Sequence, residues 1–515
     1  MESTAFSRSC ISTPHHLASA AGAEVLRSGG NALDAAVAAN LALGVVAPYR
    51  CGFGGDVVAM VWDGAELHGY LGVGAAGSRS DLDEASRATG SDRMPFDGPL
   101  TVTVPAAIAG WFDLLDRLGT RSFAELSTRS LELAAEGFRV SAHGTNIVAD
   151  GVFRFADRPG LQEIYGGVRP GRVLRQPGLA RTIETLAADG PDAFYSGPIG
   201  AAVVDHLDAV GGLVTSADLA THRGRWVDVI RGRFAGVEVA AMPPPTQGAA
   251  GLLALAIADQ LPLGVHGTGQ RHHALIEAIK RALADRDGLA ADAEAAAAHV
   301  ERVLDPEWVA HRAAEIDPRR ATPAQTTAPA GGGTACVLAA DERGGLACVV
   351  QSNLAGFGSG ESIPEWGLNL HNRGSAFTLD PASPRALGPG REPLHTLVPS
   401  IVFRDGAPAM ALAASGGDGQ IQTQLSVLAA TELDGIDPAQ ALADPRWLVN
   451  PGGGSIAYES GLDPTVVSEL EARGHDLAEG DYGEIRFGCG HAVRVGADGP
   501  DGAYDPRSEG LVAGW

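Results

Sequence analysis

The chain has 515 residues, of which 45% are apolar and 19% charged, so it can bury a large core and is not a disordered chain. Its net charge of −24 argues against nucleic acids and anionic membranes as partners. No apolar stretch is long enough to span a bilayer, and the first residues show no secretory pattern. Five sparse cysteines without C-x-x-C spacing predict free thiols and a cytoplasmic protein.

The first predicted elements are two helices that follow each other closely. Residues 15–28 carry apolar positions on one helical face and end at Gly29 and Gly30. Asn31, followed three residues later by Asp34, resembles a capping box and predicts a second helix to about residue 46. This second helix is apolar on nearly every side, which is typical of a helix buried between layers.

A glycine-rich turn, a strand and a long helical stretch come next. Residues 50–55 read RCGFGG and precede a predicted strand at 57–62. The turn lacks the glycine order of a dinucleotide-binding loop and the lysine of a phosphate-binding loop, so we interpret it as a tight structural turn. Residues 105–315 are predicted to be mostly helical, with the clearest apolar stripe at Leu275, Ile279 and Leu283.

The pattern changes at residue 334. Residues 321–333 lose hydrophobic periodicity and are predicted to form a flexible connector. Strands are predicted directly after it, at 335–340 and 346–351, and later near 400–403 and 410–414. A glycine-rich tether therefore leads straight into Thr334 at the start of a strand.

This placement allows Thr334 to be a nucleophile. A threonine hydroxyl is a poor nucleophile unless a base lies beside it. Cleavage of the bond between Gly333 and Thr334 would free an α-amine, whose ordinary pKa of about 7.7–8.0 suits proton transfer near neutral pH. From these residues alone the run GGGT is more often the end of a linker, so both interpretations stay open at this point.

Nine segments, in the same order and spread over the chain, carry a resemblance to a known family. They include PPPTQG, HNRG and SGGDGQIQTQ, and together they cover residues 29–56, 103–111, 243–248, 275–287, 351–360, 371–374, 393–402, 415–424 and 504–514. With them the chain resembles the γ-glutamyltranspeptidase family of N-terminal nucleophile (Ntn) hydrolases. The resemblance implies an α+β fold, a four-layer αββα sandwich made as one precursor that cleaves itself.

The resemblance also implies the subunits and the catalytic residues. The large subunit would be residues 1–333, ending in the linker 321–333, and the small subunit 334–515 would begin at the catalytic Thr334. Gly416 and Gly417 would supply backbone N–H donors to the oxyanion, for which the close backbone approach of glycine is suited. Ser352 matches a hydroxyl that hydrogen-bonds the nucleophile, and Asn353 beside it is a candidate substrate-binding residue.

The substrate pocket departs from that of the glutathione-hydrolysing members. Those members have an Arg-Glu-x-Ala-Pro motif whose arginine binds the substrate α-carboxylate. In this chain the corresponding residues 71–80 read LGVGAAGSRS, and Gly74 lies near the position of that arginine. Those members also have an Asn-Asn-Gln-Met-Asp-Asp segment whose aspartate binds the α-ammonium, and this chain has HNRGSA there, at 371–376. His395 and Thr396 stand where those members have two serines. We expect a γ-glutamyl substrate to be disfavoured, because both of its charged partners are gone.

The changed residues suggest a different acyl group. Arg373 with His371 and His395 would form a cationic corner that binds a carboxylate, with Thr396 beside it, although Arg373 could instead serve a structural salt bridge. The HNRG and LHT variants resemble the oxamate amidohydrolase-like branch. We therefore expect an autoprocessing hydrolase that cleaves an amide-type acyl bond of a small carboxylate-bearing substrate through an acyl-enzyme. The alternatives are a γ-glutamyl transferase or hydrolase, a carbon–carbon bond hydrolase of an antibiotic pathway, and an uncleaved, non-catalytic family member.

The remaining candidates are interpreted as structural. The pairs His15-His16 and His272-His273 lack helical ligand spacing and partner cysteines, so we expect no metal, and nothing predicts a cofactor. Cys336 lies two residues after the threonine on the same strand face and is expected to pack rather than to catalyse. The expected partners are a small acyl substrate and the two subunits of one precursor, without nucleic acid or membrane, and a homo-oligomer is left open.

Overall fold

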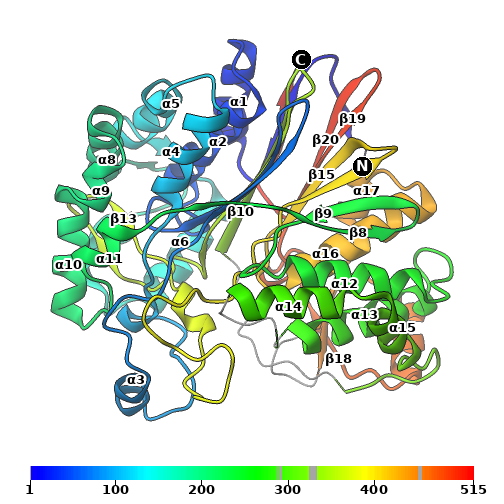
Figure 1. Ribbon diagram of the computed structural model, residues 1–515. Coiled ribbons are helices and arrows are strands. Elements are labelled where there is room, and N and C mark those ends of the chain that lie inside the picture. Colours follow the sequence, from blue (N-terminus) through cyan, green and yellow to red (C-terminus); the bar gives the residue numbers. More distant parts are fainter. Residues whose placement is uncertain (1, 287, 289–292, 324–332, 450–454) are drawn as a thin grey trace.

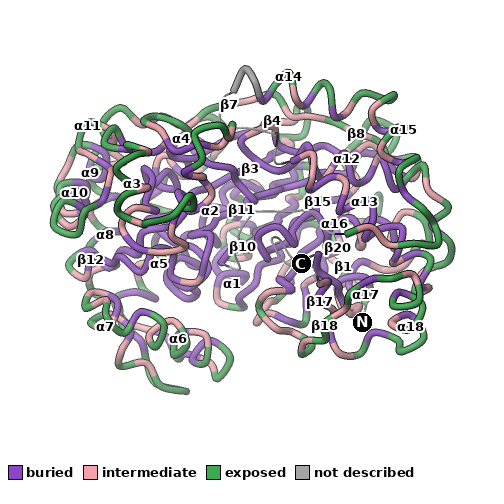
Figure 2. The backbone as a smooth tube through the Cα atoms, turned by 90° about the horizontal axis from the view of Figure 1, so that it is seen from below, coloured by how far each residue is buried: buried purple, intermediate pink, exposed green. Residues whose placement is uncertain are grey.

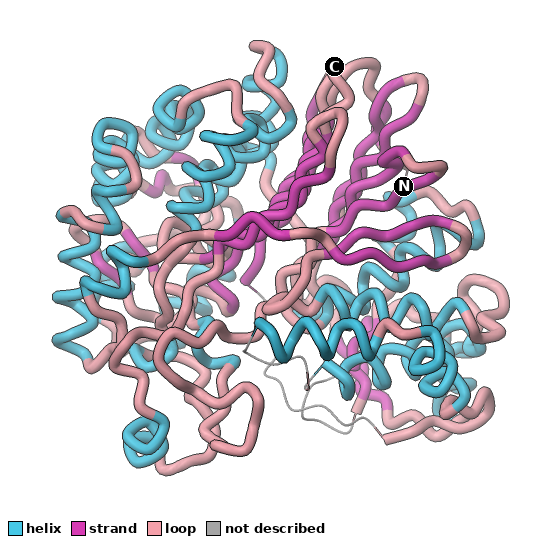
Figure 3. The backbone as a smooth tube through the Cα atoms, in the orientation of Figure 1, coloured by secondary structure: helices cyan, strands magenta, loops and turns pink. Residues whose placement is uncertain are grey.

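Two seven-stranded sheets lie face to face at the centre of the molecule, and helices cover the outer face of each (Figure 1). The structure is a computed structural model that describes residues 2–286, 288, 293–323, 333–449 and 455–515. Strands form the middle and helices the flanks in Figure 3, so the expected α+β, four-layer αββα sandwich is confirmed. Among the described helices, none is both long and apolar enough to cross a membrane.

The first sheet has the threonine strand β10 at its centre. Its strand order is β21-β2-β10-β11-β3-β4-β7, and every neighbouring pair is antiparallel. The bounds are β2 (Cys10–Thr13), β3 (Asp56–Trp62), β4 (Leu67–Gly72), β7 (Arg225–Val227), β10 (Gly333–Ala340), β11 (Leu346–Leu354) and β21 (Leu511–Gly514). The strands predicted at 57–62, 335–340 and 346–351 are confirmed.

The second sheet packs against the first through an apolar layer. Its order is β1-β20-β19-β15-β14-β9-β8. The bounds are β1 (Thr4–Ala5), β8 (Ile230–Phe234), β9 (Val237–Ala241), β14 (Ser400–Arg404), β15 (Ala407–Ala414), β19 (Gly490–Gly496) and β20 (Gly499–Tyr504). Val58, Cys336 and Leu338 of the first sheet share one buried cluster with Ile401 and Ala411 of the second. All five cysteines are buried free thiols, as predicted, and Cys336 packs within this layer.

Helices from the first half of the chain cover the outer face of the first sheet. They are α1 (His16–Arg27), α2 (Ala32–Val46), α3 (Leu82–Thr89), α4 (Ala107–Leu118), α5 (Phe123–Ala135), α6 (Ala142–Arg154), α7 (Pro159–Tyr165), α8 (Pro177–Asp189), α9 (Asp192–Tyr195), α10 (Pro198–Val210) and α11 (Ser216–Thr221), of which α3 and α11 lie at the periphery. Asn31 and Asp34 form the predicted capping box of α2. Every residue of α2 is buried, as its apolar surface on all sides predicted.

The second sheet is covered by helices from two later parts of the chain. These are α12 (Gly248–Asp259), α13 (Gly269–Arg286), α14 (Ala293–Val303), α15 (Pro306–Ala314), α16 (Gly419–Leu428), α17 (Pro438–Ala443) and α18 (Pro464–Ala472). The predicted stripe of Leu275, Ile279 and Leu283 is buried in α13. The remaining described strands form three small sheets: β5 (Phe138–Arg139) with β6 (Val173–Leu174), β12 (Ser362–Ile363) with β13 (Leu368–Asn369), and β16 (Trp447–Val449) with β17 (Ile456–Glu459) and β18 (Leu477–Gly480).

Burial follows the layers. Figure 2 shows buried residues concentrated along β3, β10, β11 and β15, whereas exposed ones gather on outer helices such as α10. Most of the predicted connector, residues 324–332, lies outside the described residues. The strand that follows it begins at Gly333 and is buried along its whole length.

Candidate active site

Thr334, Ser352 and Asp56 form a row across three neighbouring strands. The register pairs Thr334 of β10 with Ser352 of β11, and Ser352 with Asp56 of β3. Residues paired across antiparallel strands project from the same face. Two residues further along, Cys336 and Val350 lie in the layer between the sheets, so the row faces that layer too. The three polar side chains are at most 1% exposed, and they lie at the edge of this otherwise apolar layer.

The hydroxyls of this row contact the peptide bond that precedes Thr334. Thr334 Oγ1 donates to Ser352 Oγ at 3.1 Å. Ser352 Oγ in turn donates to the carbonyl oxygen of Gly333 at 2.5 Å and accepts from the backbone N–H of Leu354 at 2.7 Å. The strand register shifts between Gly333 and Thr334, an irregularity of the kind that re-aims side chains beside active sites. The hydroxyl of Thr334 and a donor to the preceding carbonyl therefore lie side by side.

Gly416 and Gly417 lie in the turn between β15 and α16. Both have left-handed backbone angles, with φ of 109° and 58°, which favour glycine. Gln247 Nε2 donates to the carbonyl oxygen of Gly417 at 3.1 Å and to that of Thr396 at 3.0 Å. Asp418, directly after the pair, is bound by the fully buried Arg286 at 2.5 Å. These contacts fix the glycine turn to the segment that carries Thr396.

His371, Arg373 and His395 come together as expected, but they do so around the carboxylate of Asp56. Asp56 Oδ2 lies 3.0 Å from His371 Nδ1, 3.3 Å from His395 Nε2 and 3.9 Å from Arg373 Nε. All four side chains are fully buried. Sequence reasoning missed Asp56, although it ends the segment 29–56 that carries part of the family resemblance.

The charges of this cluster largely compensate each other. Burial acts to raise the pKa of Asp56, and His371 and His395 outweigh it and hold that pKa well below its usual range. Burial, with Arg373 nearby, lowers the pKa of His395 to about 4, so this imidazole is neutral at pH 7. The predicted cationic corner therefore contains a carboxylate of the protein itself, because the negative charge of Asp56 faces the positive charge of Arg373.

Arg373 nevertheless keeps unused donors. Burial lowers its pKa to about 10, against the opposing influence of Asp56 and Asp418, so the guanidinium stays charged at neutral pH. Its Nη1 donates to Thr396 Oγ1 at 3.3 Å. Its Nε and Nη2 are buried and have no hydrogen-bond partner among the residues that the structure describes. Buried polar groups are normally paired, so these donors indicate an acceptor that comes from elsewhere.

Asn353 joins the glycine-rich turn to the segment that carries His371 and Arg373. Its backbone N–H donates to the carbonyl oxygen of Arg50 at 3.2 Å, and its own carbonyl accepts from Asn372 N at 3.2 Å. A Cβ added to Gly54 would lie 2.3 Å from the carbonyl oxygen of Asn369, so only glycine fits there. The turn at 50–55 is thus close-packed structure, as interpreted from the sequence.

The buried histidines make acid destabilisation the expected behaviour of the fold. Burial lowers the pKa of His395 to about 4 and those of His15, His475 and His491 to about 3. Unfolded histidines bind protons near pH 6.5, so the free energy of unfolding should fall as the pH drops from about 6.5 toward 4, by up to about 3 kcal/mol for His395 alone.

Urea unfolding at a series of pH values measures this loss. His395→Gln should flatten the slope, whereas His311→Gln, at an exposed position, should leave it unchanged. Stability that stays constant down to pH 4.5 would contradict the assignment of these histidines as neutral.

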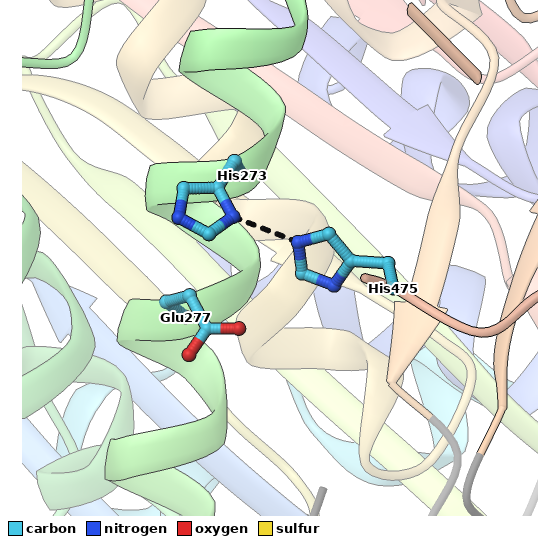
Figure 4. A group of neighbouring side chains, drawn as sticks. All are labelled: His273, Glu277 and His475. Carbon is cyan, nitrogen blue, oxygen red and sulfur yellow. Dashed lines mark hydrogen bonds between the residues drawn. The ribbon is translucent and has the colours of Figure 1, made fainter. Parts of the chain in front are cut away.

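A second polar cluster lies away from Thr334, where α13 meets the start of β18. His273 and Glu277 of α13 and His475 offer ligand atoms that lie within 4.8 Å of one another, a grouping that a metal ion could use (Figure 4). Sequence reasoning compared the histidines with each other and with the cysteines, and it overlooked the i, i+4 spacing of His273 and Glu277. His273 Nδ1 and His475 Nε2 share a hydrogen bond of 2.8 Å.

Lys280, the one lysine of the chain, completes this cluster. Its ammonium donates to Glu277 Oε1 at 2.8 Å and to the carbonyl oxygen of Thr322 at 2.7 Å. A cation beside Glu277 repels a metal ion, so we interpret the cluster as a hydrogen-bonded network. The network fastens the described start of the connector to α13 and to His475 of the later chain.

Lys280→Met is expected to destabilise the protein by about 3–5 kcal/mol, because it leaves the fully buried Glu277 carboxylate without its cation. Urea unfolding measures the change. The matched control is Arg281→Met at the next position, whose more exposed pair with Glu315 should cost about 1 kcal/mol or less. Equal costs for both variants would contradict this interpretation of the network.

Two antiparallel sheets packed face to face and covered by helices on both outer faces are the fold of the N-terminal nucleophile hydrolases, which are enzymes. The chain belongs to the gamma-glutamyltranspeptidase family, whose model matches residues 18–515. It is 33% identical to an oxamate amidohydrolase proenzyme from Klebsiella pneumoniae, over 98% of this chain and 97% of that one.

Two further relatives agree with this membership. A glutathione hydrolase-like YwrD proenzyme from Bacillus subtilis is 32% identical over 98% of both chains. The crystal structure of a cephalosporin acylase from Bacillus halodurans matches with a TM-score of 0.95 and 30% identity, over 100% of this chain and 97% of that one. The family and the oxamate amidohydrolase-like branch that the sequence motifs indicated are thus confirmed.

Proposed function

We propose that the protein is made as a precursor that cleaves itself between Gly333 and Thr334, with Thr334 as the nucleophile of the mature enzyme. The observation that carries this proposal is the contact of Thr334, Ser352 and the Gly333 carbonyl. Attack of Thr334 Oγ1 on the Gly333 carbonyl carbon forms an ester and releases the α-amine of Thr334, and water then hydrolyses the ester. The Ser352 hydroxyl is aimed at the oxygen on which negative charge develops.

In the mature enzyme, residues 1–333 form the large subunit and residues 334–515 the small one. The freed α-amine of Thr334 takes the proton of the hydroxyl as it attacks the substrate carbonyl. The backbone N–H groups of Gly416 and Gly417 stabilise the oxyanion. Water hydrolyses the acyl-threonine, so the reaction is hydrolysis rather than transfer. A cytoplasmic location stays a prediction.

The substrate that we propose is an amide of a small, carboxylate-bearing acid. The Nε and Nη2 of Arg373 have no hydrogen-bond partner among the described residues, and they match the two oxygens of a carboxylate. The enclosure of Arg373 admits only a small group. The Klebsiella relative is named for oxamate, whose amide carbonyl is bonded to a carboxylate. Both lines favour an oxalyl-type acyl group, with His371, His395 and Thr396 around the guanidinium.

Ser352→Ala tests this proposal. Without the donor to the Gly333 carbonyl, self-cleavage should slow by about 10²–10³-fold, the usual cost of losing one such donor. Denaturing gels sampled over time after purification measure the rate. Ser359→Ala is the matched control, because this equally buried serine bonds the carbonyl of Leu370 instead. Cleavage at the wild-type rate in Ser352→Ala would contradict the assigned role.

A further inference from the structure

A cavity of about 530 Å³ has Arg50 in its lining, whereas neither Thr334 nor the enclosed Arg373 lines it. Arg50 connects the cavity with Thr334, because it lines the cavity and its Nη1 donates to the carbonyl oxygen of Thr334 at 3.4 Å. Phe96, Ile147 and Phe357 give the cavity apolar walls. Its volume lies in the range that small-molecule sites commonly have.

Four arginines line this cavity, and three of them already have carboxylate partners. Arg154 pairs with Asp97 at 2.7 Å, Arg486 with Glu484 at 2.9 Å, and Arg507 with Glu459 and Asp505. For Arg50, by contrast, the described part of the chain offers no carboxylate within 4.0 Å.

The partners of Arg50 are neutral groups. Beside the Thr334 carbonyl, Arg50 Nη1 reaches Cys489 Sγ at 3.5 Å, and its guanidinium lies 5.7 Å from the centre of the Tyr49 ring. Only 5% of Arg50 is exposed. Burying a cation without a counter-charge is costly, so a built position of this kind indicates an anion that arrives with a ligand.

We propose that Arg50 binds a carboxylate on the leaving portion of the substrate, inside this cavity. The proposal rests on the proposed function, in which the small acyl group lies toward Arg373 and the amine portion must occupy the remaining space. The substrate class is then an amide between a small carboxylate-bearing acid and an amine that carries an apolar body and an anionic group.

Two anilides that differ in one carboxylate test this specificity. N-(4-carboxyphenyl)oxamate and N-phenyloxamate share the acyl group, and only the first bears an anion on its leaving amine. The wild-type enzyme should favour the first by about 10- to 100-fold in kcat/KM, the usual worth of a hydrogen bond to a charged group. Arg50→Met should abolish this preference, whereas Arg154→Met, a cavity arginine with its own partner, should keep it.

The preference is a ratio, so a general loss of activity through the Thr334 contact does not change it. An unchanged preference in Arg50→Met, or none in the wild type, would overturn the proposal. Acetanilide has the same leaving amine as N-phenyloxamate but no carboxylate on its acyl group. If Arg50→Met changes only the preference for N-phenyloxamate over acetanilide, Arg50 binds the acyl carboxylate, and the assignment to the leaving group is overturned. Should Arg50→Met fail to fold, Arg50→Lys keeps the charge and should retain a reduced preference.

A binding measurement separates this proposal from the proposed function. Calorimetry with 4-aminobenzoate and aniline on the same proteins requires no turnover. The carboxylate should bind the wild type about 10- to 100-fold more tightly than it binds Arg50→Met, and aniline should show no such difference. If neither anilide is hydrolysed, the proposed oxalyl amide chemistry fails, while this comparison still confirms or overturns the role of Arg50.

Discussion

Thr334→Ala is expected to leave the 52.7 kDa chain whole and to reduce hydrolysis by about 10⁴-fold or more, because alanine has no hydroxyl to attack either the Gly333 carbonyl or a substrate. Intact-mass measurement shows whether the chain is cut, and kcat/KM on N-phenyloxamate shows the loss of turnover. Thr334→Ser keeps a hydroxyl in place and is expected to cleave itself.

Cys336→Ala is the matched control for the first prediction. Cys336 lies on the same strand and the same face, and burial raises the pKa of its thiol well above the usual value, so it stays protonated. This variant should process normally. Cleavage of Thr334→Ala at residue 334 would contradict the assignment of the nucleophile, and an uncut Cys336→Ala would show that packing around β10 decides the result.

Asp56→Asn carries the second large effect, about 3–5 kcal/mol of lost stability, because it leaves the buried guanidinium of Arg373 without its counter-charge. The substitution also removes the charge that faces His371 and His395, so activity should fall together with stability. Urea unfolding and kcat/KM measure the two losses. The control is Asp63→Asn on the same hairpin, at an exposed position, which should stay within about 1 kcal/mol of the wild type.

A double variant separates stability from catalysis at this position. Asp56→Asn with Arg373→Met removes both charges, so much of the stability should return while activity stays low. Additive losses in the double variant would contradict the view that the two charges compensate each other. Stability without activity would support Arg373 as a substrate-binding residue rather than a purely structural one.

The architecture was largely predictable because its local signals agree with the tertiary structure. The capping box of Asn31 and Asp34 begins α2 at its observed position, and the all-round apolar surface of α2 correctly indicated burial. The change of pattern at residue 334 located β10 and β11. The layer arrangement itself came from the family motifs, since strand order cannot be deduced from periodicity alone.

The meeting of the predicted site residues could be foreseen from the family motifs, but their charge balance could not. His371, Arg373 and His395 do meet, yet the carboxylate between them comes from β3, more than 300 residues earlier in the chain. Such a pairing depends on sheet register, which one sequence does not reveal. Arg50 was missed because only the fold shows that, among the described residues, its close partners are a carbonyl oxygen and a thiol and not a carboxylate.

The most direct test of the account is the state of the purified wild-type chain. Intact mass and N-terminal sequencing should show two fragments that elute together from a sizing column, the smaller beginning at Thr334. That result would establish the bond that is cut and the amine that the mechanism requires. A wild-type protein that remains a single 52.7 kDa chain after long incubation, or one cut at another bond, would contradict the central claim.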